Sequence, residues 1–304
     1  MIDLKKISSI ALAGVLAAGL TACQAKKKVL ADGSSTVFPI SEAIAEGYGK
    51  TDTSINVSVG TSGTGGGFKR FCVGETDISD ASRRIKAEEA AKCKEKNIEY
   101  IELEIAYDGL AILVNPANTY VESLTVEQLK QIFQFENPAR TWKDINPAWP
   151  ADPIKIFAPG QDSGTYDYFV EEIIGKHGRV RADAAFSEDD NVLVTGIAGD
   201  KAAIGFFGLA YYEANKDKLK LVPIVNTKTH KAVAPEETTV RSGEYAPLSR
   251  PLFIYVSKAS AAKSEVRKFV EYYISNAADV AKRVGYIARP AETYADDLKR
   301  FQSF

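Results

Sequence analysis

Short apolar runs alternate along the chain with segments in which apolar residues recur every three or four positions. The apolar or alternating runs, which predict strands, are 29–31, 55–59, 77–78, 101–106, 110–114, 154–157 and 203–208. The segments with helical spacing begin at Ile40 and at Gly66 and continue at 87–96, 126–133, 191–197 and 266–274. Strands that alternate with helices in this way predict an α/β fold with a largely parallel sheet.

Two longer segments show neither periodicity. Segment 137–153 is rich in Pro and Trp, and we expect a connecting loop in which Trp142 and Trp149 are buried. Segment 226–247 is polar and interrupted by Gly and Pro, which predicts an exposed excursion. The chain has no internal repeat and no low-complexity tract.

Three turns rich in Gly, Ser and Thr each follow a predicted strand and precede a predicted helix. They lie in the stretches 32–40, 60–68 and 162–165. Backbone N–H groups and hydroxyls at a helix N-terminus favour an anion, although Ser and Thr are also ordinary N-cap residues. Three such turns together predict a site where many donors hold one tetrahedral oxyanion.

These segments resemble those of the periplasmic phosphate-binding proteins of ABC importers. The motifs that carry the resemblance are GSSTVFP at 33–39, DSGT at 162–165, and the segments 74–84 and 106–112. The resemblance extends from about Val29 to the C-terminal helix. It implies an α/β, two-lobed type II periplasmic binding protein with two hinge crossings, and no enzymatic activity. The implied division is 29–103 plus 249–304 for the first lobe and 104–248 for the second.

The resemblance also implies which residues contact the anion. The first lobe would supply two of the turns and the corner formed by Ser82 and Arg83, and the second lobe would supply the third turn. Matched motif by motif, the implied phosphate-binding residues are Ser34, Ser35, Thr36, Ser62, Gly63, Thr64, Ser82, Arg83, Asp162, Ser163, Gly164 and Thr165. The register within 34–37 stays open, because family members differ in length there.

The chain departs from the family pattern in its cation. Many family members carry an arginine shortly before the third turn, where this chain has the residues Ala-Pro-Gly-Gln at 158–161. Arg83 is the predicted substitute, because its planar fork matches phosphate oxygens. Arg84 is its competitor for this role.

A second departure concerns the carboxylate that accepts the proton of HPO4²⁻. Many family members carry an aspartate where this chain has Ser82. Asp162 and Asp80 are the candidate acceptors, and Asp162 could instead cap its helix. The selectivity for phosphate over fully ionised sulfate is therefore left open.

The N-terminal segment is typical of an export signal. Two lysines precede an apolar run at 7–20, which is too short and too close to the terminus for a spanning helix. Small residues followed by Cys23 resemble a bacterial lipobox. The sequence predicts a lipoprotein signal peptide at 1–22, lipidation of Cys23 and a tether at 23–28, with the protein held on the periplasmic or extracellular side of a membrane. A plain signal peptide with an incidental cysteine is the alternative.

The negative net charge means that the protein as a whole does not attract an anion. The chain has 38 Lys and Arg against 40 Asp and Glu; removal of 1–22 takes away Asp3, Lys5 and Lys6, which leaves 36 against 39 and a net charge of −3. Local dipoles must therefore attract the anion. No basic stripe with interleaved aromatic residues is present, which argues against nucleic-acid binding.

Two further cysteines remain after Cys23, namely Cys72 and Cys93. An even pair in an exported protein predicts a disulfide, with buried free thiols as the alternative. A loop of this length, about 20 residues, corresponds to roughly 3 kcal/mol of stabilisation. The two histidines, His177 and His230, lie far apart without ligands at metal-site spacing, so we expect no metal and no cofactor.

The sequence therefore predicts a lipid-anchored monomer that captures inorganic phosphate for an ABC permease. Sulfate or arsenate is the alternative ligand. A secreted serine hydrolase or phosphatase using Ser35 or Ser163 is disfavoured, because neither serine lies in a G-x-S-x-G elbow and only two histidines exist. An envelope phosphate sensor or adhesin without transport is a third class.

Overall fold

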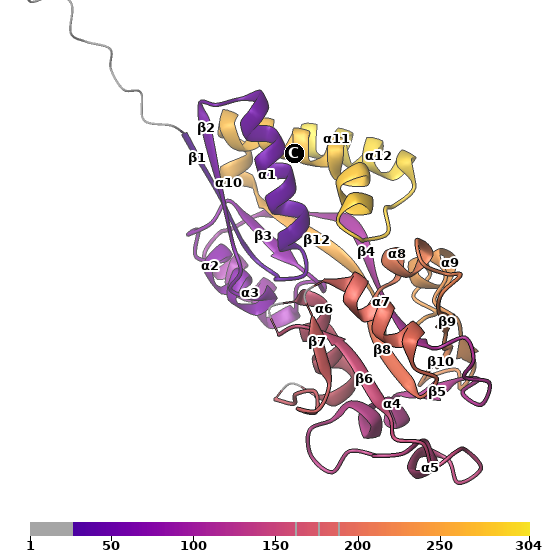
Figure 1. Ribbon diagram of the computed structural model, residues 1–304. Coiled ribbons are helices and arrows are strands. Elements are labelled where there is room, and N and C mark those ends of the chain that lie inside the picture. Colours follow the sequence, from indigo (N-terminus) through magenta and orange to yellow (C-terminus); the bar gives the residue numbers. More distant parts are fainter. Residues whose placement is uncertain (1–26, 162, 176, 188) are drawn as a thin grey trace, which may run out of the picture.

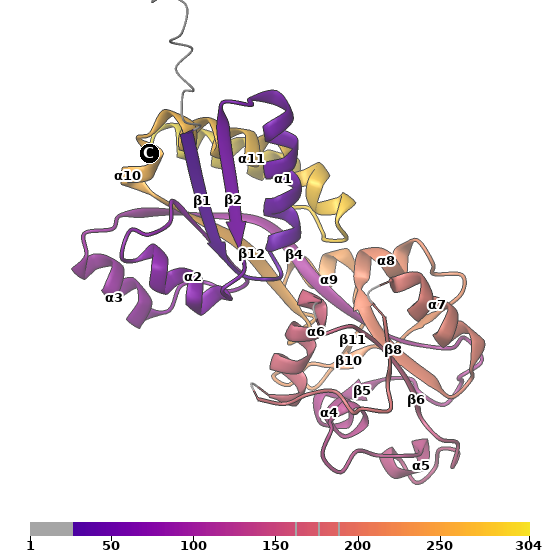
Figure 2. The ribbon, with the colours of Figure 1, turned by 60° about the vertical axis from the view of Figure 1, so that its left-hand side comes forward.

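The structure is a computed structural model that describes residues 27–161, 163–175, 177–187 and 189–304. The predicted signal peptide, the lipidation site Cys23 and most of the tether lie outside these residues. The described chain forms two lobes joined by two long strands, which Figures 1 and 2 show crossing from one lobe to the other. Among the described helices, none is long and apolar enough to cross a membrane.

Lobe 1, defined here as 27–108 plus 249–304, contains the first three strands and both ends of the described chain. Its strands are β1 (Lys27–Gly33), β2 (Ile55–Gly60) and β3 (Ile78–Ala81). Its helices are α1 (Phe38–Thr51), α2 (Thr64–Phe71), α3 (Ala87–Glu95), α10 (Lys258–Ala261), α11 (Ser264–Arg283) and α12 (Ala291–Gln302). Helices α1 and α11 cover one face of the sheet, and α2 covers the other (Figure 2).

Lobe 2, defined as 109–248, has its own hydrophobic core. Its strands are β5 (Leu124–Thr125), β6 (Lys155–Pro159), β7 (Ala185–Ser187), β8 (Ala203–Gly208), β9 (Lys220–Leu221), β10 (Ile224–Val225) and β11 (Ala232–Val233). Its helices are α4 (Val126–Phe133), α5 (Trp142–Ile145), α6 (Gly164–Phe169), the π-helix η1 (Val170–Ile174), α7 (Asp190–Gly199), α8 (Leu209–Glu213) and α9 (Glu237–Arg241). Strands β5, β10 and β11 form a small separate sheet.

The crossing strands are β4 (Tyr100–Val114) and β12 (Ser249–Ser257). The other described strands form one nine-stranded sheet in the order β2-β1-β3-β12-β4-β8-β6-β7, with β9 beside β4. Pairing is parallel between β1 and its neighbours and between β6 and its neighbours, and antiparallel where β4 and β12 take part. Strand β4 changes partner from β12 to β8 between Gly109 and Leu110, so the lobes meet there. The α/β fold class is confirmed.

Local sequence explains where the elements begin. Helix α4 starts after Thr125, whose hydroxyl accepts from the N–H of Gln128 at 3.1 Å while the Gln128 side chain accepts from the N–H of Thr125 at 2.9 Å. This capping box satisfies two N–H groups that the helix itself leaves unpaired. Helix α1 carries Pro39 in its first turn, where no helical N–H bond is lost.

Each of the two aperiodic segments is largely exposed but places a few side chains in the core, and Trp149, which was expected to be buried, is only partly so. Trp142 is fully buried, as expected, and its indole N–H donates to the carbonyl of Ala202 at 3.1 Å. The expected exposed excursion at 226–247 is confirmed for its stretches 227–232, 236–238 and 242–244, but not for the whole segment. Val240 and Tyr245 are buried in the core of lobe 2, and the Tyr245 hydroxyl donates to the carbonyl of Leu110 at 3.0 Å. Isolated apolar residues in a polar segment leave no periodic signal.

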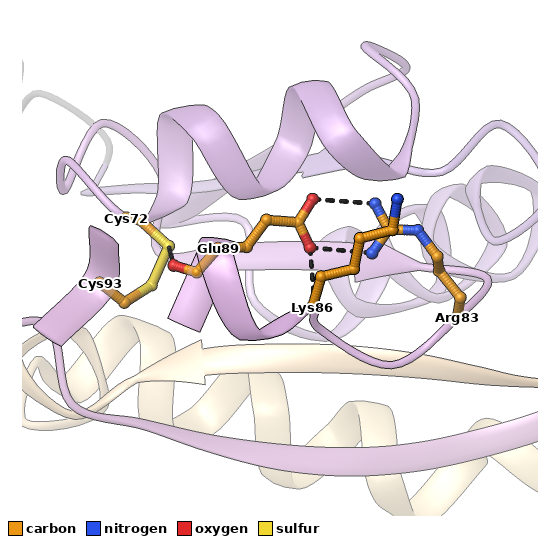
Figure 3. The surroundings of a disulfide bond; sticks show 5 residues. All are labelled: Cys72, Arg83, Lys86, Glu89 and Cys93. Atoms are coloured by element: carbon orange, nitrogen blue, oxygen red, sulfur yellow. Dashed lines mark hydrogen bonds and ion pairs between the residues drawn. A yellow bond between two sulfur atoms is a disulfide. The ribbon is translucent and has the colours of Figure 1, made fainter. Parts of the chain in front are cut away.

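The predicted disulfide between Cys72 and Cys93 is confirmed, with the two Cα atoms 4.2 Å apart. It joins the C-terminal end of α2 to α3, and Figure 3 shows Glu89 of α3 reaching from this cross-link toward Arg83. The disulfide therefore fixes α3 next to the corner that the sequence assigns to anion binding.

Candidate anion-binding cleft

A cavity of about 910 Å³ lies between the two lobes beside the crossing strand β12. Lobe 1 lines it with parts of all three segments that the sequence assigns to it, and lobe 2 lines it with residues of α6 and η1. The predicted site residues in its lining are Ser34, Ser35, Thr36, Gly63, Thr64, Ser82 and Arg83.

The first turn connects β1 to α1 and depends on Gly33. This glycine has a φ of +146°, and a Cβ at this position would overlap the carbonyl oxygen of Asp80. The N–H of Ser34 donates to that same carbonyl at 2.9 Å. The Ser34 side chain is buried, and its hydroxyl accepts from the N–H of Val37 at 3.4 Å, so it supports the start of α1.

Thr36 is held from two sides within the first turn. Its hydroxyl oxygen accepts from Nη2 of Arg250 at 2.7 Å, and its carbonyl accepts from the Tyr286 hydroxyl at 2.8 Å. Because a guanidinium can only donate, the proton of the Thr36 hydroxyl stays available for another acceptor. Thr36 is therefore set up as a donor in the wall of the cleft.

The second turn begins with a serine that faces the interior of lobe 1. The backbone N–H and the hydroxyl of Ser62 donate to Asp32 at 3.1 and 2.7 Å, and Arg70 donates to the same carboxylate at 2.6 Å. Burial would raise the pKa of Asp32, but the hydrogen bonds from Ser62 and Arg70 outweigh burial and lower it. Ser62 is not part of the cavity lining. Its hydroxyl stabilises the turn through Asp32.

Gly63 and Thr64, which follow, do face the cavity. Gly63 has a φ of +75°, in the left-handed region, and lies at the N-cap of α2. The Thr64 hydroxyl accepts from the N–H of Ser82 at 3.2 Å and lies 3.1 Å from the Ser82 hydroxyl. The second turn and the corner after β3 are thus joined into one wall. This wall includes the start of α2, whose first N–H groups have no partner within the helix.

The third turn comes from lobe 2 and lies directly against the first turn. A Cβ at Gly164 would be 3.0 Å from Cα of Thr36. The Ser163 hydroxyl accepts from the N–H of Thr165 at 3.2 Å, as an N-cap does. Ser163, Gly164 and Thr165 lie outside the cavity lining, and Asp162 lies outside the described residues.

A hydrogen bond also joins the two lobes at this contact. The Ser35 hydroxyl of lobe 1 lies 3.5 Å from a carboxylate oxygen of Asp167 in α6 of lobe 2. These residues are 132 positions apart in the sequence. Local patterns predict the turns themselves but carry no signal for a contact at that separation.

The two arginines of the corner after β3 both line the cavity, and both are paired with carboxylates. Arg83 donates to the two oxygens of Glu89, each at 2.8 Å, in the bidentate arrangement seen in Figure 3. Arg84 pairs with Glu102 and lies 3.9 Å from Glu104. The structure therefore places Arg83 at the cleft with its charge already balanced by Glu89.

A third arginine at the cleft had no role in the sequence-based prediction. Arg250 of β12 lines the cavity, contacts Asp108 of β4 at 3.3 Å and lies 3.4 Å from the ring centre of Tyr168 in α6. The available signal was a single cation between Ser249 and Pro251, at the start of an otherwise apolar crossing segment. The residues that Arg250 contacts are far away in the sequence, so this isolated cation did not indicate a binding site.

Asp80 of β3 is fully buried beside the first turn. Neither carboxylate oxygen has a hydrogen-bond partner of normal geometry in the described part of the chain. Burial raises the pKa of Asp80 to about 7, while the nearby Ser41 hydroxyl opposes that rise. An unpaired buried carboxylate is costly and is typical of functional sites. No three His, Cys, Asp or Glu side chains gather as a metal site among the described residues.

The fold and the cleft between two lobes define a two-lobed solute-binding protein, and a model of the PBP superfamily domain matches residues 21–277. The chain is 51% identical over 277 residues to Protein SphX of Synechococcus elongatus, covering 90% of this chain and 81% of that protein. It is 42% identical over 280 residues to the phosphate-binding protein PstS of Staphylococcus haemolyticus, covering 92% of this chain and 86% of that protein. The chain belongs to this family of phosphate-binding proteins.

A solved structure supports the same family assignment. A possible phosphate binding protein from Planctomyces limnophilus matches with a TM-score of 0.88 and 42% sequence identity, covering 91% of this chain and 98% of that one. The predicted family and the prediction of a binding protein rather than an enzyme are confirmed.

Proposed function

We propose that this protein binds inorganic phosphate in the cleft between its lobes and delivers it to an ABC permease. The observation that carries the proposal is the contact between Gly164 of lobe 2 and Thr36 of lobe 1. It brings together two hydroxyl-rich turns, each at the start of a helix. A hinge at the crossing strands then allows the lobes to close on an anion that both of them bind.

The donors come from residues that the sequence assigns to phosphate. The Thr36 hydroxyl has a free proton, and the Ser163 hydroxyl keeps its own proton while it accepts from Thr165. Thr64 and Ser82 of lobe 1 add further hydroxyls to the cavity lining, and Arg83 adds a cation. Many donors around one tetrahedral anion replace the water that the anion loses on entry.

Asp80 is the proposed acceptor for a proton of the ligand. A carboxylate inside the site accepts a hydrogen bond from the protonated oxygen of HPO4²⁻, whereas fully ionised sulfate has no proton to donate. Asp80 is not part of the cavity lining, but its backbone pairs with Gly33 of the first turn, and its unpaired oxygens support this assignment. Asp162, the other candidate of the sequence, lies outside the described residues.

Replacement of Ser163 by alanine tests the role of the third turn. We expect the affinity for phosphate to fall roughly ten- to more than a hundredfold, because a hydrogen bond to a charged group is lost. Calorimetric titration of the wild-type chain and the variant with phosphate and with sulfate measures this. Ser275→Ala, on the exposed face of α11, is the control and should bind phosphate like the wild type. Unchanged affinity in Ser163→Ala contradicts the proposed contact, and equal binding of sulfate contradicts phosphate selectivity.

The same proposal includes attachment to a membrane through acyl groups on Cys23 and function as a monomer. The small residues before Cys23 support the anchor. Intact mass spectrometry of protein extracted from membranes is expected to show a chain that begins at an acylated Cys23. An unmodified N-terminus would remove the anchor from the proposal without affecting phosphate binding.

A further inference from the structure

The cations that line the cleft differ in how firmly their carboxylate partners hold them. Glu89 binds both terminal nitrogens of Arg83 at 2.8 Å. Asp108 contacts only Nε of Arg250, at the longer distance of 3.3 Å. The Arg83 pair is thus a complete bidentate pair within lobe 1, and the Arg250 pair is an incomplete one.

Arg250 contacts parts of both lobes. Its Nη2 group donates to Thr36 of lobe 1, and its guanidinium lies over the ring of Tyr168 of lobe 2. Its own strand, β12, is one of the two crossings between the lobes (Figure 1). The Nη1 group makes no hydrogen bond to any described residue, so part of the fork is free.

Arg250 is more shielded from water than Arg83, so solvent weakens its interaction with other charges less. Its side chain is only 13% exposed, against 34% for Arg83. Ion pairs that are largely withdrawn from water are screened less than exposed ones. Burial raises the pKa of Asp108, and Arg250 opposes this rise. Glu172 of lobe 2 shows the same balance between burial, which raises its pKa, and Arg250, which lowers it.

We infer that Arg250 is the cation that pairs with the bound phosphate, and that Asp108 is the carboxylate that holds Arg250 while the cleft is empty. This inference rests on the proposed function. On binding, the loose contact with Asp108 is replaced by a fork-to-oxyanion contact, for which a guanidinium is suited. The charge of the ligand is thereby compensated from the crossing strand.

The test uses variants of Arg250 and Asp108, for which we expect opposite changes in phosphate affinity. Arg250→Gln keeps a polar side chain but removes the charge, and we expect phosphate affinity to fall about 30-fold or more. Arg250→Lys should recover part of this loss. Asp108→Asn removes the competing carboxylate with little change of shape, and we expect phosphate to bind several-fold more tightly. Arg140→Gln, at an exposed ion pair of lobe 2, is the control and should bind normally.

Calorimetric titration with inorganic phosphate measures each affinity, and thermal unfolding of each chain without phosphate reports folding. Arg83→Ala belongs in the same series and should lose less affinity than Arg250→Gln, since Glu89 already balances its charge. Wild-type affinity in Arg250→Gln overturns the inference, and so does weakened binding in a folded Asp108→Asn. If Arg250→Gln fails to fold, Arg250→Lys and Asp108→Asn decide. Absence of phosphate binding by the wild-type chain would instead overturn the proposed function itself.

Discussion

Replacement of Gly33 by alanine is expected to destabilise the protein by roughly 2–6 kcal/mol, from the backbone strain of a side chain at such a φ and from overpacking. Its φ is +146°, and a Cβ would overlap the carbonyl oxygen of Asp80. That carbonyl is part of the backbone of β3, so it cannot move aside as a flexible side chain would. Urea unfolding followed by circular dichroism gives the free energy of unfolding.

Gly49→Ala is the matched control for this variant. Gly49 lies within α1, and a Cβ there would meet nothing within 4 Å. Alanine is favoured over glycine inside a helix by about 0.5–1 kcal/mol, so this variant should be slightly more stable than the wild type. Equal free energies of unfolding for the two variants would contradict the tight approach of the first turn to β3.

Replacement of Asp80 by asparagine is expected to raise stability at pH 8 while it weakens phosphate binding. Burial raises the pKa of Asp80 in the folded protein to about 7, from an ordinary value of 3.8. Between these two pKa values the unfolded chain loses the proton first, so the carboxyl group makes the folded state less stable as the pH rises. Asparagine removes this cost, which amounts to at most about 4 kcal/mol at pH 8 and vanishes near pH 4.

Asp80→Asn should weaken phosphate binding, although it should make the folded protein more stable at pH 8. The loss of a charge-assisted hydrogen bond is expected to lower phosphate affinity about ten- to a hundredfold and to reduce discrimination against sulfate. Unfolding at pH 4 and pH 8, together with calorimetry, measures both effects. Asp200→Asn is the control for the direction of the stability change. Hydrogen bonding to Lys155 lowers the pKa of Asp200, so replacement of Asp200 should make the protein less stable at pH 8. Lower stability of Asp80→Asn at pH 8 would contradict an unpaired carboxyl group.

The sequence predicts the elements well where their signal is local. The capping box at Thr125 and the period-two and apolar runs of β2 and β8 depend on neighbouring residues alone. The disulfide follows from the cysteine count in an exported chain. The turns are equally visible, since Gly, Ser and Thr gather where strands end and helices begin.

Long-range contacts explain what the sequence could not predict. The hydrogen bond between Arg250 and Thr36 joins residues 214 positions apart, and nothing near either residue indicates the other. The hydroxyl of Ser62 has the right chemistry for an anion, but Asp32, 30 positions earlier, binds it. Strand pairing decides which residues lie close enough to compete with a ligand for such a hydroxyl, and a local motif does not show this.

A crystal structure of the mature chain grown with phosphate is the decisive measurement for binding between the lobes. We expect one anion in the cleft, within hydrogen-bond distance of Thr36 from lobe 1 and of Ser163 from lobe 2. An anion held by residues of a single lobe, or one bound outside the cleft, would contradict this arrangement.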